Sequence, residues 1–316
     1  MLWQPLAAAG AVIAVSLARR RLRLPRKLMV PVVSTVPLMV GVAIPRGRAQ
    51  YAALWVSYVW VFKAAWEIPY DKPEKLRRRL HLEYPIRVDR LLGGGAPPGV
   101  RLQRALRDPP RVNALDGALT AGIYVLWLVP HGVLAWILLS DMQRFPRAAG
   151  RLSAVYHLTT LGYWLVPTAP PWWASEQEQT ALSGLIQHVT RDVELTVKQR
   201  LTGRPSPSPD ERREADGKGG NPWGSMPSDA FPAAVVTAKT LREISPQAGA
   251  IGWSTAVLHG SALVYLGEHY VTDLIAGWLL VELVWRAEPW MRPPVRFANI
   301  MLRMAERGIR SFGGAS

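Results

Sequence analysis

The chain has 316 residues, 49% of them hydrophobic, and a formal net charge of +15 at pH 7. It contains no cysteine, which excludes disulfide bonds. No nucleic-acid recognition motif accompanies the positive charge, so we expect no nucleic-acid partner.

Seven long apolar runs dominate the sequence, and several approach the ~20 residues that cross a ~30 Å hydrocarbon core. Backbone polar groups in lipid must be satisfied within the segment, so these runs should be helices. The 14 tryptophans suit the aromatic belts at membrane interfaces. We predict an all-α fold, a polytopic membrane helix bundle with membrane lipid around it. The runs are residues 2–18, 28–44, 51–66, 114–139, 152–166, 248–266 and 270–285.

The first third of the chain divides into two parts. Residues 1–70 are predicted to hold N-terminal membrane helices; the run 2–18 lacks the basic start and cleavage site of a signal peptide. Residues 71–113 are basic, and Leu102 and Leu106 lie among arginines, which predicts an amphipathic segment at the membrane surface.

The remainder is a main helical core, residues 114–290, with a polar excursion at 174–224. Apolar residues at helical spacing predict an amphipathic helix over 175–201. The composition of residues 202–220 predicts a disordered loop. Residues 291–316 form a basic tail that we expect on the cytoplasmic side. The positive-inside rule does not settle the topology, because the basic loops cannot all be cytoplasmic with simple crossings.

The stretch GEHYVTD carries the first chemical signal. His269 and Asp273 are four residues apart at the start of an apolar helix, so their side chains share one face. A carboxylate beside an imidazole fixes the tautomer, and an imidazole held in this way can act as a nucleophile or base. The alternative is an interfacial pair that only caps the helix.

The stretch SMPSDAF, residues 225–231, carries the second signal. Ser228 is a good N-cap residue and Pro232 suits a first helical turn, so a helix should begin here. The free N–H groups at such a terminus suit a phosphate. Taken alone, the stretch also fits an ordinary helix start.

Together, NPWGSMPSDAF and VYLGEHYVTDLIAGW resemble the type 2 phosphatidic acid phosphatase superfamily, over roughly residues 90–285. The stretches PTAPPWW and PPGVRLQRAL are similar to its branch that contains inositol phosphorylceramide synthase and bacterial relatives. The resemblance implies a six-helix phosphatase core, to which this chain adds N-terminal helices. It also implies metal-independent chemistry, so we expect no cofactor and no metal.

In the mechanism that the resemblance implies, His269 attacks phosphorus and forms a phosphohistidine, while Asp273 orients it. Ser228 and neighbouring N–H groups hold phosphate oxygens. A second histidine, where this chain has Ala230, protonates the leaving alcohol. The arginine and the Lys-x6-Arg-Pro motif found elsewhere in the superfamily are also absent, so we expect other cations to hold the phosphate: Arg101, Arg104 and Arg191.

Two explanations of Ala230 compete. A deliberate replacement that silences the enzyme is favoured, since the rest of the site is intact and alanine is the usual substitute for a removed side chain. The alternative is a natural pseudoenzyme that binds lipid phosphate without catalysis. On the first explanation the chain is an inactive variant of a lipid-phosphate phosphatase or phosphotransferase.

The resemblance also implies where the chain acts. The helices that begin near Ser228 and His269 must start on one membrane face, with residues 242–246 on the other, cytoplasmic side. We therefore expect a multi-pass protein of the plasma membrane with an extracytoplasmic site. The expected substrate is a phosphorylated lipid: a polyprenyl phosphate, a phosphatidate-like lipid or an inositol phospholipid.

Overall fold

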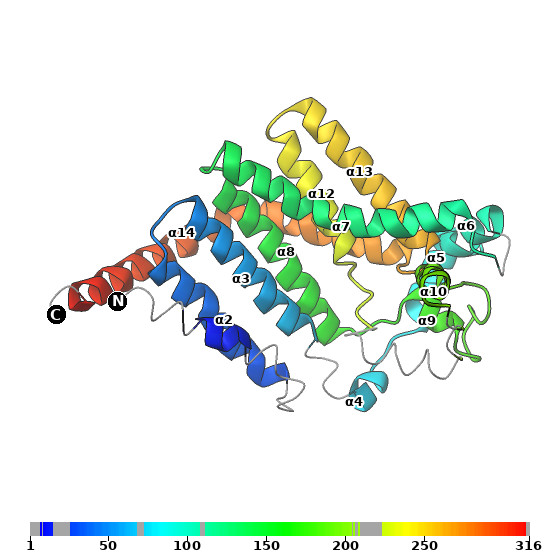
Figure 1. The fold of residues 1–316 in the computed structure, drawn as a ribbon. Helices are drawn as coiled ribbons and strands as arrows, with labels where there is room; N and C mark the ends of the chain where they lie inside the picture. The colour runs from blue at the N-terminus through cyan, green and yellow to red at the C-terminus, as the bar shows by residue number, and fades with distance from the viewer. Residues whose placement is uncertain are drawn as a thin grey trace. The chain divides into compact units, whose positions relative to one another are not determined.

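The computed structural model describes residues 7, 9–14, 26–67, 73–107, 111–203, 205, 208 and 223–313. Over these ranges the chain is helical, with isolated β-bridges in place of strands. The all-α prediction is therefore confirmed (Figure 1). Most of the predicted helix 2–18 and most of the predicted disordered loop 202–220 lie outside the described residues.

The described helices form two compact units. One comprises Met1–Asp71, Ala135–Arg151 and Glu282–Ser316. In it α2 (Arg26–Ala43) packs against α3 (Arg48–Glu67). A buried arginine, Arg151, forms an ion pair with Glu288 at 2.6 Å.

The other unit, Lys72–Leu134 and Leu152–Val281, holds the motifs singled out in the sequence. Three of its helices, α7, α8 and α14, continue into the first unit. Its elements are α4 (Pro73–Arg77), α5 (Glu83–Leu92), α6 (Pro98–Leu106), α7 (Ala114–Ser140), α8 (Phe145–Leu165), α9 (Pro171–Ser175), α10 (Val189–Thr202), α12 (Ala230–Arg242), α13 (Pro246–Tyr265) and α14 (Val271–Gly313).

Six of the seven apolar runs coincide with helices, namely α2, α3, α7, α8, α13 and the first part of α14. Among the described residues, α7 alone combines the length and the apolar composition of a membrane span, and Leu28–Ala43 is a shorter apolar stretch. The multi-pass topology stays a prediction. The helix α14 runs without a break past residue 290, where the sequence suggested that a tail begins.

The predicted helix over 175–201 is wrong in its first half. Residues 176–188 form turns, and α10 begins at Val189. Gly184 has φ +68°, a left-handed conformation that interrupts a helix. The apolar residues that suggested helical spacing, Leu182 and Ile186, are buried in a core cluster from within these turns. Their apolar character therefore reflects burial within the turns and not the period of a helix.

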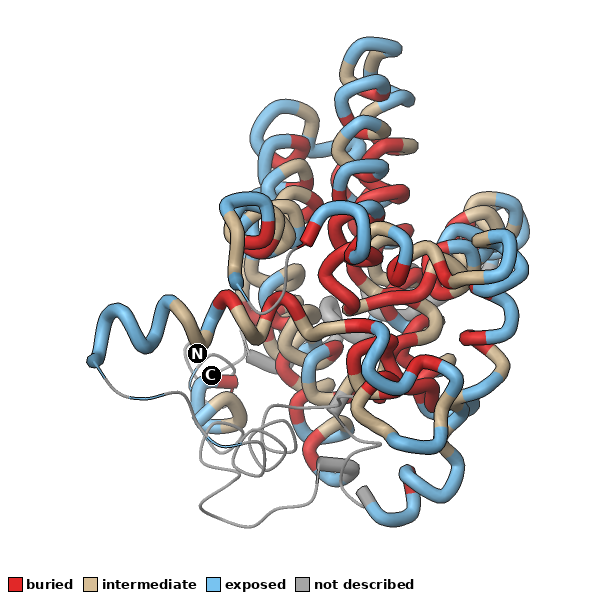
Figure 2. The backbone as a smooth tube through the Cα atoms, turned by 90° about the vertical axis from the view of Figure 1, so that its right-hand side faces the viewer, coloured by how far each residue is buried: buried red, intermediate tan, exposed pale blue. Residues whose placement is uncertain are grey.

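The helices α12 and α13 pack against each other as an antiparallel pair joined by a short turn (Figure 1). Small residues permit the close approach: a Cβ on Gly252 would lie 2.7 Å from the Cα of Ala238. Along most helices buried and exposed segments alternate, so that each helix has a packed side and a free side (Figure 2). The SMPSDAF stretch leads into α12 and the GEHYVTD stretch follows α13, so this helix pair positions both motifs.

We predict that Gly252→Ala destabilises the protein although alanine favours a helix by roughly 1 kcal/mol over glycine. The added methyl forces α12 and α13 apart, and such overpacking costs roughly 1–3 kcal/mol. Thermal unfolding in detergent should show a lowered midpoint. The matched control is Gly122→Ala in α7, where a Cβ meets no atom within 4 Å and the midpoint should stay or rise. Equal midpoints for the two variants would contradict the packing role of Gly252.

Candidate functional site

A tight turn between α13 and α14 positions His269. Gly267, within this turn, has φ +81°, and a Cβ there would lie 2.7 Å from the carbonyl oxygen of Gln187. Only glycine fits both the conformation and the space. The backbone N–H of Trp172 donates to the Gly267 carbonyl at 3.1 Å, and that of Val189 donates to Leu266 at 3.2 Å. The turn is therefore held from two sides.

The Asp273 carboxylate organises the site. It is fully buried, and its Oδ2 accepts from the Ser225 hydroxyl at 2.6 Å and from the Tyr270 backbone N–H at 2.9 Å. The Nδ1 atom of His269 lies 3.3 Å from the same oxygen. An ionised carboxylate only accepts hydrogen bonds, so Nδ1 carries the proton and Nε2 holds the free lone pair. No described residue makes a hydrogen bond to Nε2.

The starts of α12 and α14 lie together. The backbone N–H of Ser228 donates to the Asp273 carbonyl at 3.2 Å, which ties the SMPSDAF stretch to the GEHYVTD stretch. The Ser228 hydroxyl, fully buried, accepts from the Phe231 N–H at 3.3 Å and so caps α12. This leaves the N–H groups of Asp229 and Ala230, for which the described residues supply no acceptor. They are the open donors at this helix terminus.

Asp89, from α5, caps the start of α14. Its two carboxylate oxygens accept from the backbone N–H groups of Val271 at 3.1 Å and Thr272 at 2.9 Å, and from the Thr272 hydroxyl at 2.6 Å. The side chain is 1% exposed. A carboxylate at a helix N-terminus also interacts favourably with the helix dipole. Asp89 therefore fixes the helix turn that carries Asp273.

Three loop segments run side by side beneath the site. Thr168 bridges to His81 on one side and to Gly224 on the other. The backbone N–H of Ser225 donates to the Thr168 carbonyl at 3.2 Å, so the PTAPPWW stretch positions the serine that holds Asp273. The Tyr84 hydroxyl adds a contact of 3.0 Å with the Thr168 hydroxyl.

The charge state of His269 follows from its surroundings. Burial alone lowers the pKa of its imidazole, but the hydrogen bond to Asp273 and the charge of Asp273 more than offset this effect. The charges of Asp229 and Glu268 act in the same direction. The net result is a pKa raised above the ordinary value of histidine. The imidazole is thus a stronger base than the side chain of a free histidine. It also stays protonated, and so without a free lone pair, up to a higher pH.

A second imidazole–carboxylate pair adjoins the first. Nε2 of His188 lies 3.1 Å from the Glu268 carboxylate, and its ring stacks on Trp172 with centroids 4.2 Å apart. Burial raises the pKa of Glu268, but the neighbouring His188, together with His269, brings it below the ordinary value.

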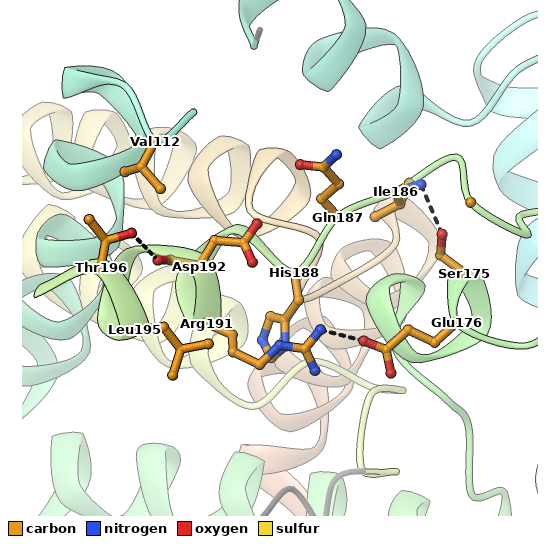
Figure 3. Close-up of a pocket in the computed structure, with 11 residues that line it drawn as sticks. Val112, Ser175, Glu176, Ile186, Gln187, His188, Arg191, Asp192, Leu195 and Thr196 are labelled. Atoms are coloured by element: carbon orange, nitrogen blue, oxygen red, sulfur yellow. Dashed lines mark hydrogen bonds and ion pairs between the residues drawn. The ribbon is translucent and has the colours of Figure 1, made fainter. Parts of the chain in front are cut away.

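His188 also lines a pocket of about 560 Å³ next to this pair (Figure 3). Its wall combines α10 with the turns before it. Arg191 reaches across the pocket to a hydrogen bond and ion pair with Glu176, and its guanidinium lies 5.6 Å from the Trp172 ring centroid. Asp192 lines the same pocket. The lining therefore combines charged side chains of both signs with the apolar Val112, Ile186 and Leu195.

The three arginines predicted to hold phosphate lie in different surroundings. Arg101 is exposed and donates to the Gly94 carbonyl at 2.9 Å, and Arg104 is exposed as well. Arg191 alone lines the pocket. The sequence reading missed Arg107, whose side chain is 1% exposed and lies 3.4 Å from Asp116.

Arg107 belongs to a buried network near the end of α13. It lies 3.6 Å from the carboxylate of Asp192, and the Tyr265 hydroxyl donates to Asp116 at 2.5 Å. Gln103 adds a neutral clamp, since its side-chain amide donates to the Tyr265 carbonyl at 2.8 Å and accepts from the Gln187 N–H at 2.9 Å. Both features brace the turn that carries His269.

A model of the PAP2 superfamily, the phosphatidic acid phosphatases of type 2, matches residues 86–287. The match covers more than half of the chain and both motifs. It does not separate the inositol phosphorylceramide synthase-like branch from the others. No curated protein and no solved structure matches the chain significantly.

We predict that Asp89→Ala lowers the free energy of unfolding by about 1–3 kcal/mol, because it leaves buried N–H groups of α14 without an acceptor. Denaturant unfolding in detergent measures the change. Asp89→Asn keeps an acceptor oxygen and should cost less. A result in which both variants are as stable as the parent would show that the cap contributes nothing.

Proposed function

The chain belongs to the PAP2 superfamily, and from this membership we propose that it is an integral membrane lipid-phosphate phosphatase or phosphotransferase with His269 as its nucleophile. One observation carries the proposal. The Asp273 carboxylate holds Nδ1 of His269 while the start of α12 lies beside it, which brings a nucleophile and open backbone donors together.

In the first step Nε2 of His269 attacks the phosphorus of the substrate. The N–P bond forms as the bond to the leaving oxygen breaks, and Asp273 stabilises the positive charge that develops on the ring. In the second step the oxygen of water or of an alcohol attacks the phosphohistidine. The N–P bond breaks and the attacking oxygen loses its proton, which balances the proton that the leaving oxygen takes up in the first step. The neutral imidazole is thereby restored.

Phosphate oxygens would be held at the N-terminus of α12. The N–H groups of Asp229 and Ala230 are open, and the helix dipole favours an anion there. Ser228 contributes by capping this turn, and its hydroxyl lies in the same turn. Electrostatic stabilisation of this kind is often the largest single contribution to rate.

The pocket beside His188 would receive the polar part of the lipid or of the acceptor. Arg191 is the arginine best placed to meet it, because it lines the pocket and is held by Glu176. Arg101 and Arg104 are exposed, which suits contacts with lipid phosphates at the membrane surface.

The proposed setting is a multi-pass protein of the plasma membrane with its site on the extracytoplasmic face. The core spans residues 114–290, with N-terminal helices before residue 70, an interfacial segment at 71–113 and a basic tail from 291. The substrate is a polyprenyl phosphate, a phosphatidate-like lipid or an inositol phospholipid. Similarity of PTAPPWW and PPGVRLQRAL to the synthase-like branch favours transfer over hydrolysis.

A specific observation supports a second candidate. Ala230 stands where the superfamily pattern has the histidine that protonates the leaving group, and without an acid the first step slows by roughly 10²–10⁴-fold. A chain slowed to that extent would serve as a lipid-phosphate-binding pseudoenzyme.

The deciding comparison is between the chain as given and Ala230→His. Phosphate release and head-group transfer are measured over a panel of lipid phosphates and diphosphates in bilayers. If no other residue supplies the acid, the enzyme proposal predicts that Ala230→His increases turnover by roughly 10²–10⁴-fold. Adding His269→Ala to that variant should remove the activity.

The control for folding is thermal unfolding of each variant. If Ala230→His turns over no substrate of the panel while the chain as given binds phospholipid tightly, the pseudoenzyme replaces the enzyme as the function. If activity persists after His269→Ala, the nucleophile is a different residue.

A further inference from the structure

One buried histidine has no place in the chemistry described so far. His259, on α13, is 1% exposed, and both of its ring nitrogens are buried without a hydrogen-bond partner among the described residues. An unpartnered polar group in a protein interior costs about 1–3 kcal/mol. A cost of this size at a helix that carries the site calls for a compensating role.

The turn of α13 that carries His259 lies level with residue 230 at the start of α12, where the superfamily pattern has a histidine. A Cβ on the next residue, Gly260, would lie 2.9 Å from the Phe231 ring and 3.2 Å from the Leu274 side chain. This turn of α13 therefore faces the first turns of α12 and α14, which carry Ala230 and Asp273.

A further observation places the face of α13 that carries His259 near residue 230. Ala230 packs in one buried cluster with Leu263, which lies one helical turn after His259 on the same face of α13.

We propose that His259 supplies the proton that the missing histidine at 230 would have given. The inference rests on the proposed function, since it assigns the acid of that reaction. The dianionic phosphate of a bound substrate favours the charged form of an adjacent imidazole. As the bond from phosphorus to the leaving oxygen breaks, the His259 ring gives its N–H proton to that oxygen and becomes neutral. It then takes a proton from the attacking water or alcohol, which restores it.

The test uses four full-length chains in bilayers: the chain as given, His259→Gln, Ala230→His, and the double variant. Glutamine keeps a polar group at the site but cannot transfer a proton. We expect turnover by the chain as given to fall by roughly 10²–10⁴-fold on His259→Gln. In the Ala230→His background the same change should cost at least tenfold less, because histidine 230 then provides the acid.

Two controls separate catalysis from folding. His157→Gln removes an exposed histidine of α8 and should leave turnover unchanged. Thermal unfolding is measured for every chain. If His259→Gln does not fold, His259→Asn and His259→Phe take its place. A loss of turnover that both variants share, and that is smaller in the Ala230→His background, still identifies a proton-transfer role.

The possible failures are distinguishable. Equal losses in the two backgrounds, with a lowered unfolding temperature, would make His259 a structural residue and overturn the inference. Activity in Ala230→His but none in the chain as given would overturn it too, while the proposed function stands. Absence of activity in all four chains would remove the inference together with the proposed function.

Discussion

The buried carboxylate of Asp273 is the group on which the candidate site depends. One of its oxygens accepts from the Ser225 hydroxyl, from the Tyr270 backbone and from Nδ1 of His269. A buried charge is costly unless donors offset it, and at Asp273 all three donors meet Oδ2, whereas Oδ1 is buried without a hydrogen-bond partner among the described residues. The backbone carbonyl of the same residue receives the Ser228 N–H, which joins the starts of α12 and α14. Asp273 thereby fixes both His269, the proposed nucleophile, and the N-terminus of α12.

The sequence predicted the parts of this arrangement that are local. Apolar runs located α7, α8 and α13 because helix formation and burial leave a continuous hydrophobic pattern. The four-residue spacing placed His269 and Asp273 on one face, as the structure has them. The partners that come from distant segments, Ser225 and Asp89, have no local signal, because nothing in a short polar stretch tells which helix it will meet.

One error and one omission have clear physical causes. Apolar residues over 175–188 looked helical, but residues buried in turns follow no required period, and a left-handed glycine ends any helix there. Three arginines follow one another at intervals of three residues in and after α6. The helix exposes Arg101 and Arg104, whereas the chain turns to extended backbone at Arg107 and carries its side chain inward to Asp116. The hydropathy of the sequence alone does not tell which of these three arginines is buried.

The central claim is that His269 is the nucleophile, and the covalent intermediate tests it most directly. Ala230→His is mixed with a lipid phosphate, quenched at alkaline pH where phosphohistidine survives, and digested for peptide mass spectrometry. The account predicts one phosphoryl group on His269 during turnover, absent when substrate is omitted. Turnover with the phosphoryl group on another residue, or with none on the protein, would contradict it.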